Sequence, residues 1–334
     1  DWSSDVCSSD LCVPGLERSH AHSVVGAARG EGDAVARSRR WLRGPRPRIT
    51  ASMDLGLDER VVLVTGASGG IGRSVAAALA EEGARVVLHG HRGVDGLRTW
   101  LDEQPWRERA VVLAADVRDA DALEAGLRSA TEGLGRLHGC VVNAGIWPPE
   151  DTPLVDLDAE RIRAVMDVNV LGAFWTTRAF LRLVRERGAD PGGDGASIVY
   201  TGSTAAKFGE RGHSDYAASK SALAGLMRSV KNEITALDPY GRVNIVEPGW
   251  TVTEMTAKNL DAPGVIEKVV RTMPVQQLAA PEDIAATVLW LLSPRMARHV
   301  SGETITVAGG MEGRVLREEF EVDPEGVKRR LGLA

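Results

Sequence analysis

Short runs of apolar residues alternate along the chain with longer stretches in which apolar positions recur at helical spacing. Runs that are apolar at almost every position indicate strands covered on both faces. The expected strands are residues 60–66, 85–90, 110–117, 138–145, 196–203, 242–249 and 303–310. The expected helices are residues 72–83, 119–135, 158–187, 216–234 and 281–293. This alternation predicts the α/β class.

The pattern further predicts one doubly wound Rossmann-type domain, with about seven parallel strands and helices on both faces of the sheet. Ligands of such sheets bind beyond the carboxyl ends of the strands. Glycine-rich and polar motifs do follow the expected strands. The segment 251–277 has no clear strand or helix pattern, and the charged tail 312–334 is expected to be partly helical.

Residues 1–52 lack this periodicity. The first eleven, DWSSDVCSSDL, resemble the in-frame translation of a sequencing-library adapter. Residues 12–52 are rich in Arg, Gly and Ala, as a translated upstream region or a disordered basic tail would be. No secretory signal fits this opening. We expect 1–52 to be a non-native or disordered leader, 53–311 a catalytic domain beginning at Met53, and 312–334 a C-terminal extension.

Charge and cysteine usage exclude several classes of function. The net charge is −6, and the first 52 residues contain eight arginines against six acids, so the remainder is more acidic still. An acidic domain is a poor candidate for nucleic-acid binding. No apolar stretch reaches the ~18 residues of a membrane span. Cys140 is the one cysteine beyond residue 52 and is expected to be buried, which suits a reducing cytoplasm.

The motif TGASGGIG, residues 65–72, directly follows the first expected strand and opens a helix. Gly66, Gly70 and Gly72 allow a sharp turn and a close approach of the backbone to a pyrophosphate. The following helix presents unpaired N–H groups to that anion. The spacing is Gly-x-x-x-Gly-x-Gly, and it predicts a dinucleotide site.

Further motifs follow the later strands in order. These are NAG at 143–145, Asn169 in DVNVLGAF, Ser203, the YAASK motif with Tyr216 and Lys220, and PGWTVT from Pro248 to Thr253. Together with the glycine turn they resemble the short-chain dehydrogenase/reductase family over residues 57–311, and most closely its 3-oxoacyl-acyl-carrier-protein reductase-like members. The resemblance implies a dinucleotide cofactor and hydride transfer to or from a carbonyl carbon.

Tyr216 and Lys220 are four residues apart and therefore share one helix face. A free tyrosine has a pKa near ~10, and a neighbouring ammonium lowers it. The resemblance implies that Tyr216 is the general acid in reduction, that Lys220 also binds the nicotinamide ribose, and that Ser203 binds the substrate oxygen. The resemblance also implies that Asn169 holds a water molecule that links Lys220 to solvent. The alternative is that Asn169 has a structural role and kinks its helix. A non-catalytic nucleotide-binding scaffold or redox sensor would have lost Tyr216 or Lys220.

The end of the second strand bears on the choice of cofactor. Gly90, His91 and Arg92 stand there, without the carboxylate that binds an NAD ribose. The two cationic side chains favour NADP(H) over NAD(H), because they could bind a ribose 2′-phosphate. Against this, Gly69 stands where many NADP-using relatives carry a basic residue. The alternative for His91 and Arg92 is a solvated turn without a role in cofactor binding. No metal is expected. The expected cofactor site is Gly66, Ser68, Gly70, Ile71, Gly72, His91, Arg92, Asp116, Val117, Asn143, Ala144, Gly145, Tyr216, Lys220, Pro248, Gly249, Thr251 and Thr253.

The substrate is less well determined by the sequence. By resemblance, 251–277 forms a substrate lid, whose side chains include Met255, Leu260, Val265, Ile266, Lys258 and Lys268. A ketone, and first a 3-oxoacyl thioester, is expected, with secondary-alcohol, sugar and polyketide-type dehydrogenases as alternatives. An acyl carrier protein as partner would need a basic surface, for which the sequence offers Arg211, Lys258 and Lys268.

Three further residues lie near the expected substrate end. Trp147 and Trp250 either line the substrate site or only pack, and His213 is expected to be a solvated loop residue. By resemblance, the chain assembles into a homodimer or homotetramer through the helices 158–187 and 216–234 and the last strand. The tail 312–334 would then either cross such an interface or hang free.

Overall fold

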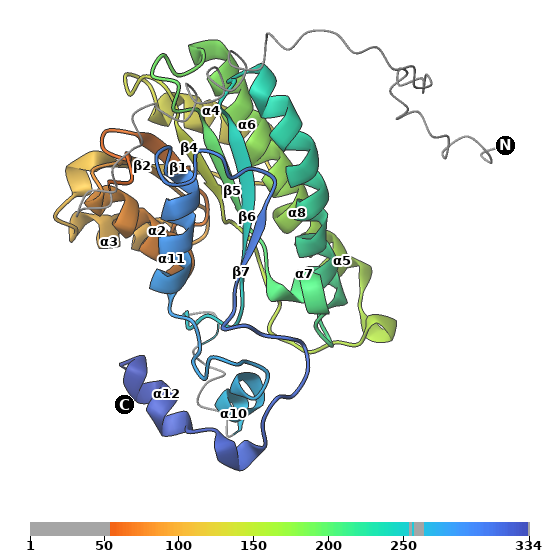
Figure 1. The fold of residues 1–334 in the computed structure, drawn as a ribbon. Coiled ribbons are helices and arrows are strands. Elements are labelled where there is room, and N and C mark those ends of the chain that lie inside the picture. The colour runs from red at the N-terminus through yellow and green to blue at the C-terminus, as the bar shows by residue number, and fades with distance from the viewer. Residues whose placement is uncertain (1–53, 254–255, 257–263, 333–334) are drawn as a thin grey trace, which may run out of the picture. The chain divides into compact units, whose positions relative to one another are not determined.

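The computed structural model describes residues 54–253, 256 and 264–332. Contacts divide the chain into Asp1–Met53 and Asp54–Ala334, and the second unit is described here (Figure 1). The predicted leader 1–52 therefore lies outside the described residues. So do Met255, Lys258 and Leu260 of the predicted lid.

Seven parallel strands form one sheet in the order β3-β2-β1-β4-β5-β6-β7, which confirms the predicted doubly wound fold. The strand order reverses at β1, which pairs with β2 on one side and with β4 on the other. Such a reversal is where a doubly wound sheet opens a ligand crevice. The strands are β1 (Val61–Val64), β2 (Arg85–Gly90), β3 (Ala110–Ala114), β4 (Gly139–Val142), β5 (Ser197–Thr201), β6 (Arg242–Pro248) and β7 (Thr304–Val307).

Helices cover both faces of the sheet (Figure 1). They are α2 (Gly70–Glu81), α3 (Val94–Asp102), α4 (Ala120–Ala130), α5 (Ala159–Met166), α6 (Gly172–Arg187), α7 (Thr204–Phe208), α8 (Ser214–Glu233), α10 (Val265–Val270), α11 (Pro281–Leu292) and α12 (Pro324–Arg330). Short turns add η1 (Arg107–Arg109), η2 (Leu154–Asp156), the π-helical η3 (Asp167–Leu171), η4 (Ile234–Ala236) and η5 (Glu319–Glu321).

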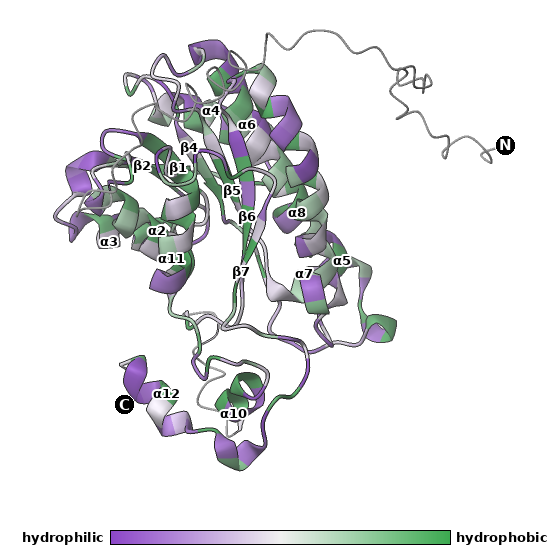
Figure 2. Cartoon of the chain, in the orientation of Figure 1, coloured by the Kyte–Doolittle hydropathy of each residue, from purple (hydrophilic) through white to green (hydrophobic). Residues whose placement is uncertain are grey.

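The two faces of the sheet have separate cores, because side chains alternate along each strand. Val61 and Leu63 of β1 pack with α4, α6 and α8, whereas Val62 and Val64 pack with α2, α3 and α11. Figure 2 shows hydrophobic residues on the strands of the sheet and on the helices that flank it. Cys140 of β4 is fully buried, as predicted, and burial raises the pKa of its thiol.

The sequence pattern overestimated the length of several strands. β3 ends at Ala114 and β4 at Val142, because the polar residues that follow turn away into loops at the carboxyl edge. The stretch expected as one helix over 158–187 is α5, the π-helical turn η3 and α6. The short helices α3, α7 and α10 were not predicted, because each spans too few turns for a clear period.

The C-terminal extension is folded and does not hang free. Its helix α12 packs on α10, and Val322 and Val327 share a small apolar cluster with Ile266 and Val270. This cluster is distinct from the two cores that flank the sheet. In the described part of the chain, no helix combines the length and apolarity required to cross a bilayer.

Candidate active site

The glycine turn joins β1 to α2 and is held by the end of β4. Gly66 has a φ of +66°, which favours glycine. The Asn143 side chain donates to the carbonyl oxygens of Thr65 and Gly66 at 3.0 and 3.2 Å. A Cβ at Gly72 would collide with the carbonyl oxygen of Gly66, and one at Gly70 would lie 2.9 Å from Thr253 Cγ2. The turn is thus a tight backbone cradle with the open N-terminus of α2 beside it, which fits a dinucleotide pyrophosphate.

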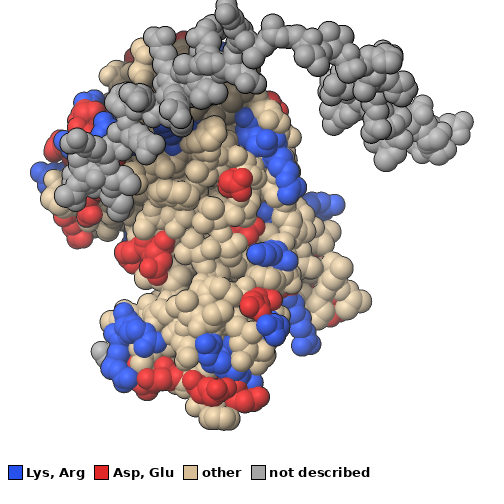
Figure 3. Space-filling model, viewed as in Figure 1, with Lys and Arg blue, Asp and Glu red and all other residues tan. Residues whose placement is uncertain are grey.

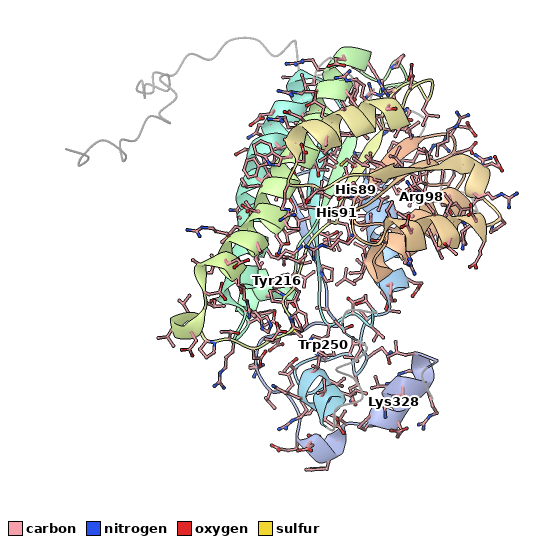
Figure 4. The ribbon with its side chains drawn as sticks, turned by 180° about the vertical axis from the view of Figure 1, so that it is seen from behind. His89, His91, Arg98, Tyr216, Trp250 and Lys328 are labelled. Atoms are coloured by element: carbon pink, nitrogen blue, oxygen red, sulfur yellow. The ribbon has the colours of Figure 1, made fainter. Side chains whose placement is uncertain are left out.

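His89 supports this cradle from below, a role that the sequence analysis missed. Its Nδ1 accepts from the Gly66 N–H at 3.3 Å, and its Nε2 donates to the carbonyl oxygen of Ala115 at 3.1 Å. The side chain is 2% exposed, and burial lowers its pKa to about 4, so the ring is neutral at pH 7. Its one signal in the sequence is a polar residue that follows three apolar residues within the strand. His89 and the exposed His91 are labelled in Figure 4.

Helix α8 brings the predicted catalytic side chains together. Lys220 Nζ donates to the carbonyl oxygen of Thr201 at 2.8 Å and lies 5.8 Å from the centre of the Tyr216 ring. Tyr216 and Ser203 are hydrogen-bonded through their side chains. Ser203 also caps α7, since its Oγ accepts from the Ala205 N–H at 3.1 Å. Three of the four predicted residues therefore meet where β5 ends.

The protonation of Tyr216 differs from the expectation. Burial raises its pKa to about 12, and the hydrogen bond from Ser203 opposes this without cancelling it. The net shift of the Tyr216 pKa is therefore upward, whereas the sequence predicted a lowering by the Lys220 ammonium. Lys220 is itself buried, and desolvation lowers its own pKa to about 8.

Asn169, the fourth predicted residue, lies in the π-helical turn η3 and uses its amide to position a loop. Its Oδ1 accepts from the Ile146 N–H at 2.8 Å, and its Nδ2 donates to Ile146 O and to Ser219 Oγ at 3.0 Å each. A Cβ at Gly145 would lie 3.2 Å from Asn169 Oδ1 and 3.3 Å from Lys220 Nζ. The loop after β4 therefore lies directly against Lys220, and Asn169 fixes it there.

Arg161 of α5 is a second residue that the sequence analysis missed. Its Nε donates to the buried carboxylate of Asp215 at 3.0 Å, and its Nη1 to Glu150 O and Thr152 Oγ1 at 2.8 Å each. Asp215 directly precedes Tyr216 in the first turn of α8. The guanidinium thus ties the loop after β4 to the start of α8.

Comparison with known proteins agrees with this geometry. The sequence family described as Enoyl-(Acyl carrier protein) reductase matches residues 66–312. The chain belongs to the short-chain dehydrogenase/reductase family. The L-rhamnose 1-dehydrogenase (NAD(P)(+)) of Azotobacter vinelandii is 34% identical over 76% of this chain and 97% of the relative. The acetoacetyl-CoA reductase of Synechocystis is 33% identical over 77% and 98%.

Solved structures of the family lead to the same conclusion. The 3-oxoacyl-[acyl-carrier protein] reductase of Brucella melitensis aligns with a TM-score of 0.69 at 31% identity, over 87% of this chain and 99% of its own. The predicted family and fold are thereby confirmed. The chain is an NAD(P)-dependent oxidoreductase of the type that acts on alcohol and ketone groups.

In this short-chain dehydrogenase/reductase, the loops after β2 and β3 form one end of the crevice. His91 and Arg92 are exposed, and a Cβ at Gly93 would lie 3.1 Å from Ser68 Cβ of the glycine turn. Asp116, in the loop after β3, brings a carboxylate close to this turn, with its Oδ2 3.8 Å from His91 Nδ1. Arg118 binds that carboxylate with Nε at 2.9 Å and holds its pKa at about 2.

The remaining predicted cofactor residues line the same edge. The Ala144 N–H donates to Thr65 Oγ1 at 3.1 Å. Val117 is buried against Gly172, where an added Cβ would lie 2.7 Å from Val117 Cγ2. After Pro248, Thr251 Oγ1 donates to Gly249 O at 3.1 Å, and Thr253 N–H to Thr256 Oγ1 at 2.9 Å. Ile71 lies in the first turn of α2 and is partly buried.

The substrate end differs from expectation at His213. This residue is buried rather than solvated, stacks on Trp147 at a ring distance of 4.8 Å, and donates from Nε2 to Pro148 O at 2.9 Å. Trp147 is therefore held by packing. Trp250 packs against the small apolar cluster around α10. Among the described residues, no group of three acidic, His or Cys side chains is arranged to hold a metal ion.

Proposed function

We propose that this chain interconverts a ketone and a secondary alcohol with NADP(H), with Tyr216 as general acid in the direction of reduction. The observation that carries the proposal is the meeting of Tyr216, Ser203 and Lys220 beside a glycine cradle at the carboxyl edge of the sheet. A non-catalytic scaffold has no need for a buried tyrosine and lysine in this arrangement.

The dinucleotide, when bound, supplies the hydride for reduction or accepts it in oxidation. As charge develops on the substrate oxygen, the Ser203 and Tyr216 hydroxyl groups donate to it. A pKa of about 12 keeps Tyr216 protonated at neutral pH, which suits a group that must deliver a proton. The Lys220 ammonium stabilises the resulting phenolate, and Asn169 keeps the loop after β4 against that lysine.

Fixed features of this chain fit the cofactor. Gly66, Gly70 and Gly72 leave no room for side chains where the pyrophosphate would approach. Asn143, Pro248 and the following threonines would border the remaining length of the dinucleotide. The exposed His91 and Arg92, next to Ser68, support NADP over NAD, since Asp116 is already bound by Arg118.

For the substrate, a 3-oxoacyl thioester is the first candidate, because of the resemblance to 3-oxoacyl-acyl-carrier-protein reductases. A sugar or sugar alcohol is the second, because an L-rhamnose 1-dehydrogenase and a galactitol 2-dehydrogenase are among the relatives. A carrier protein is less favoured as partner. Acidic and basic side chains are mixed on the part of the surface formed by the extension (Figure 3), including Glu318, Glu319, Glu321 and Arg314.

The proposal is tested by following consumption of NADPH and of NADH with a short 3-oxoacyl thioester, and formation of each with L-rhamnose and galactitol. Tyr216→Phe is the matched control, since it removes one hydroxyl. NADPH-dependent turnover that disappears in Tyr216→Phe supports the cofactor and the acid together. Faster turnover with NADH would overturn the NADP assignment, and full activity of Tyr216→Phe would overturn the role of Tyr216.

A further inference from the structure

The extension beyond residue 312 lies outside the length that matches the family, yet it is built into the fold. Val322 and Val327 are 8% and 1% exposed, among apolar side chains of α10 and of the segment that follows it. Their neighbours are Ile266, Val270, Met273 and Leu278. Burial of this kind stabilises both partners, so the extension and α10 form one packed unit.

Hydrogen bonds tie the same two segments together. Arg317 donates from Nη2 to Pro274 O at 2.8 Å and from Nη1 to Met273 O. Arg330 donates to Gln277 Oε1 at 2.6 Å and to Gln276 O at 2.7 Å. In the other direction, Arg271 Nε donates to Arg317 O at 2.9 Å. The extension is therefore attached at both ends to the chain between α10 and α11.

Helix α10 depends on this attachment. It spans six residues, and helices much shorter than about 12 residues are marginal without tertiary packing. Its buried side chains Ile266 and Val270 face the cluster that the extension completes. Without Val322 and Val327 these side chains would lose apolar partners, so α10 would be ordered for less of the time.

Trp250 connects this unit to the reaction site. It directly follows Pro248 and Gly249 at the end of β6, and it packs against the same cluster. The adjacent backbone pairs with the segment after α10, since Val252 N–H donates to Ala279 O at 2.8 Å and Ala279 N–H to Trp250 O at 3.0 Å. Figure 4 shows Trp250 between the labelled Tyr216 and Lys328 of α12.

We propose that the C-terminal extension positions the outer wall of the substrate site, with Val327 and Arg317 as positioning residues that hold α10 and Trp250 in place. This inference rests on the proposed function, because it assigns the wall to the same ketone site. A wall that is in place for only about one tenth of the time raises the apparent dissociation constant of the substrate about tenfold. The cofactor cradle, made by β1, β2 and β4, stays unaffected.

The test compares Val327→Asp with Val315→Asp in the full chain. Both lie in the extension, but Val315 is 59% exposed, so its variant controls for the added charge. Val327→Ile is the conservative variant that keeps an apolar side chain. Three quantities are measured: amide hydrogen exchange over residues 265–273, NADPH affinity by nucleotide fluorescence, and kcat and KM for the ketone.

We expect Val327→Asp to speed exchange in 265–273 and to raise KM about tenfold, with kcat and NADPH affinity within about twofold of the parent. Val315→Asp and Val327→Ile should resemble the parent chain. Unchanged exchange in Val327→Asp, or faster exchange with unchanged KM, would overturn the inference. If the parent chain turns over no ketone, the proposed function fails, whereas exchange still reports whether the extension holds α10.

Discussion

At the scale of single residues, burial decides the protonation of the site. Tyr216 has a pKa of about 12 and Lys220 one of about 8, both because charge is disfavoured away from water. Tyr216 is therefore protonated at neutral pH. In the proposed mechanism this state suits reduction, and oxidation is expected to speed up with rising pH.

The first prediction concerns Tyr216→Phe. Loss of general acid catalysis should lower kcat for ketone reduction about 10³-fold, within the usual range for such groups. NADPH affinity should change less than about twofold, because the glycine cradle is untouched. Steady-state kinetics and nucleotide fluorescence provide the two measurements. A large loss of affinity with little loss of kcat would contradict the assignment.

The second prediction concerns the pH dependence of stability at His89. Its pKa falls from 6.5 in the unfolded chain to about 4 in the fold, so between these values the unfolded chain binds the extra proton. The stabilising contribution is complete above pH 6.5 and is lost as the pH falls toward 4, by about 3 kcal/mol. Urea unfolding from pH 7 to 4 measures this loss.

His89→Asn should remove that part of the slope, while the exposed His91→Asn serves as control. His138 also has a pKa lowered to about 4 by burial, and it remains in both variants. The test is therefore the difference between the two variants. Equal slopes for His89→Asn and His91→Asn would contradict the buried, neutral state of His89.

At the scale of elements, helix α8 is held by contacts that the hydrophobic periodicity of the sequence does not reveal. Arg161 of α5 is paired with Asp215 of α8, whose side chain is fully buried. The stretch expected as one long helix is divided by η3, because Asn169 turns its amide to the loop at Ile146. These contacts explain how Tyr216 and the loop after β4 keep their relative positions.

The third prediction follows from that pair. Arg161→Met leaves the Asp215 carboxylate buried without its partner and should cost about 3–5 kcal/mol of unfolding free energy. Arg161→Met combined with Asp215→Asn should recover much of it. Arg98→Met breaks an exposed pair with Asp95 and should cost less than about 1 kcal/mol. Equal losses for Arg161→Met and Arg98→Met would show that the buried pair has no special role.

At the scale of the whole molecule, one helical face is left uncovered. A groove between α6 and α8 is lined by the apolar residues Phe174, Trp175, Leu181 and Leu226 and also by the charged residues Arg178, Arg182, Arg185 and Glu233, and Phe174 is 44% exposed. Exposed apolar patches of this kind mark protein interfaces. At the edge of the sheet, β7 has alternate residues exposed and one side unpaired. Both features support the predicted pairing of copies through these elements.

The fourth prediction is that the full chain is a homodimer or homotetramer in solution. Phe174→Asp should lower the mass measured by light scattering, because a charge replaces the exposed apolar side chain at the groove. Phe320→Asp is the control, since Phe320 is 86% exposed in the extension. A monomeric parent chain would contradict the prediction, as would equal dissociation of both variants.

The sequence by itself determined the α/β class, the succession of strands and helices along the chain, and the candidate residues Ser203, Tyr216 and Lys220. These follow from local patterns: apolar runs, glycine spacing, and the four-residue interval on one helix face. It also located the glycine turn, because strand, turn and helix are contiguous there. Confirmation of the family and fold came from the matched relatives and the parallel sheet.

Only the tertiary structure decided the roles of His89, Arg161 and His213 and the place of the extension. Each depends on partners far away in sequence: Gly66 for His89, Asp215 for Arg161, Pro148 for His213. The pKa of Tyr216 likewise depends on how deeply the side chain is buried. Burial results from the packing of the whole fold, and no local sequence pattern encodes it. In the sequence, Val327 is an ordinary apolar residue in a charged tail, and only the fold shows that it packs against α10.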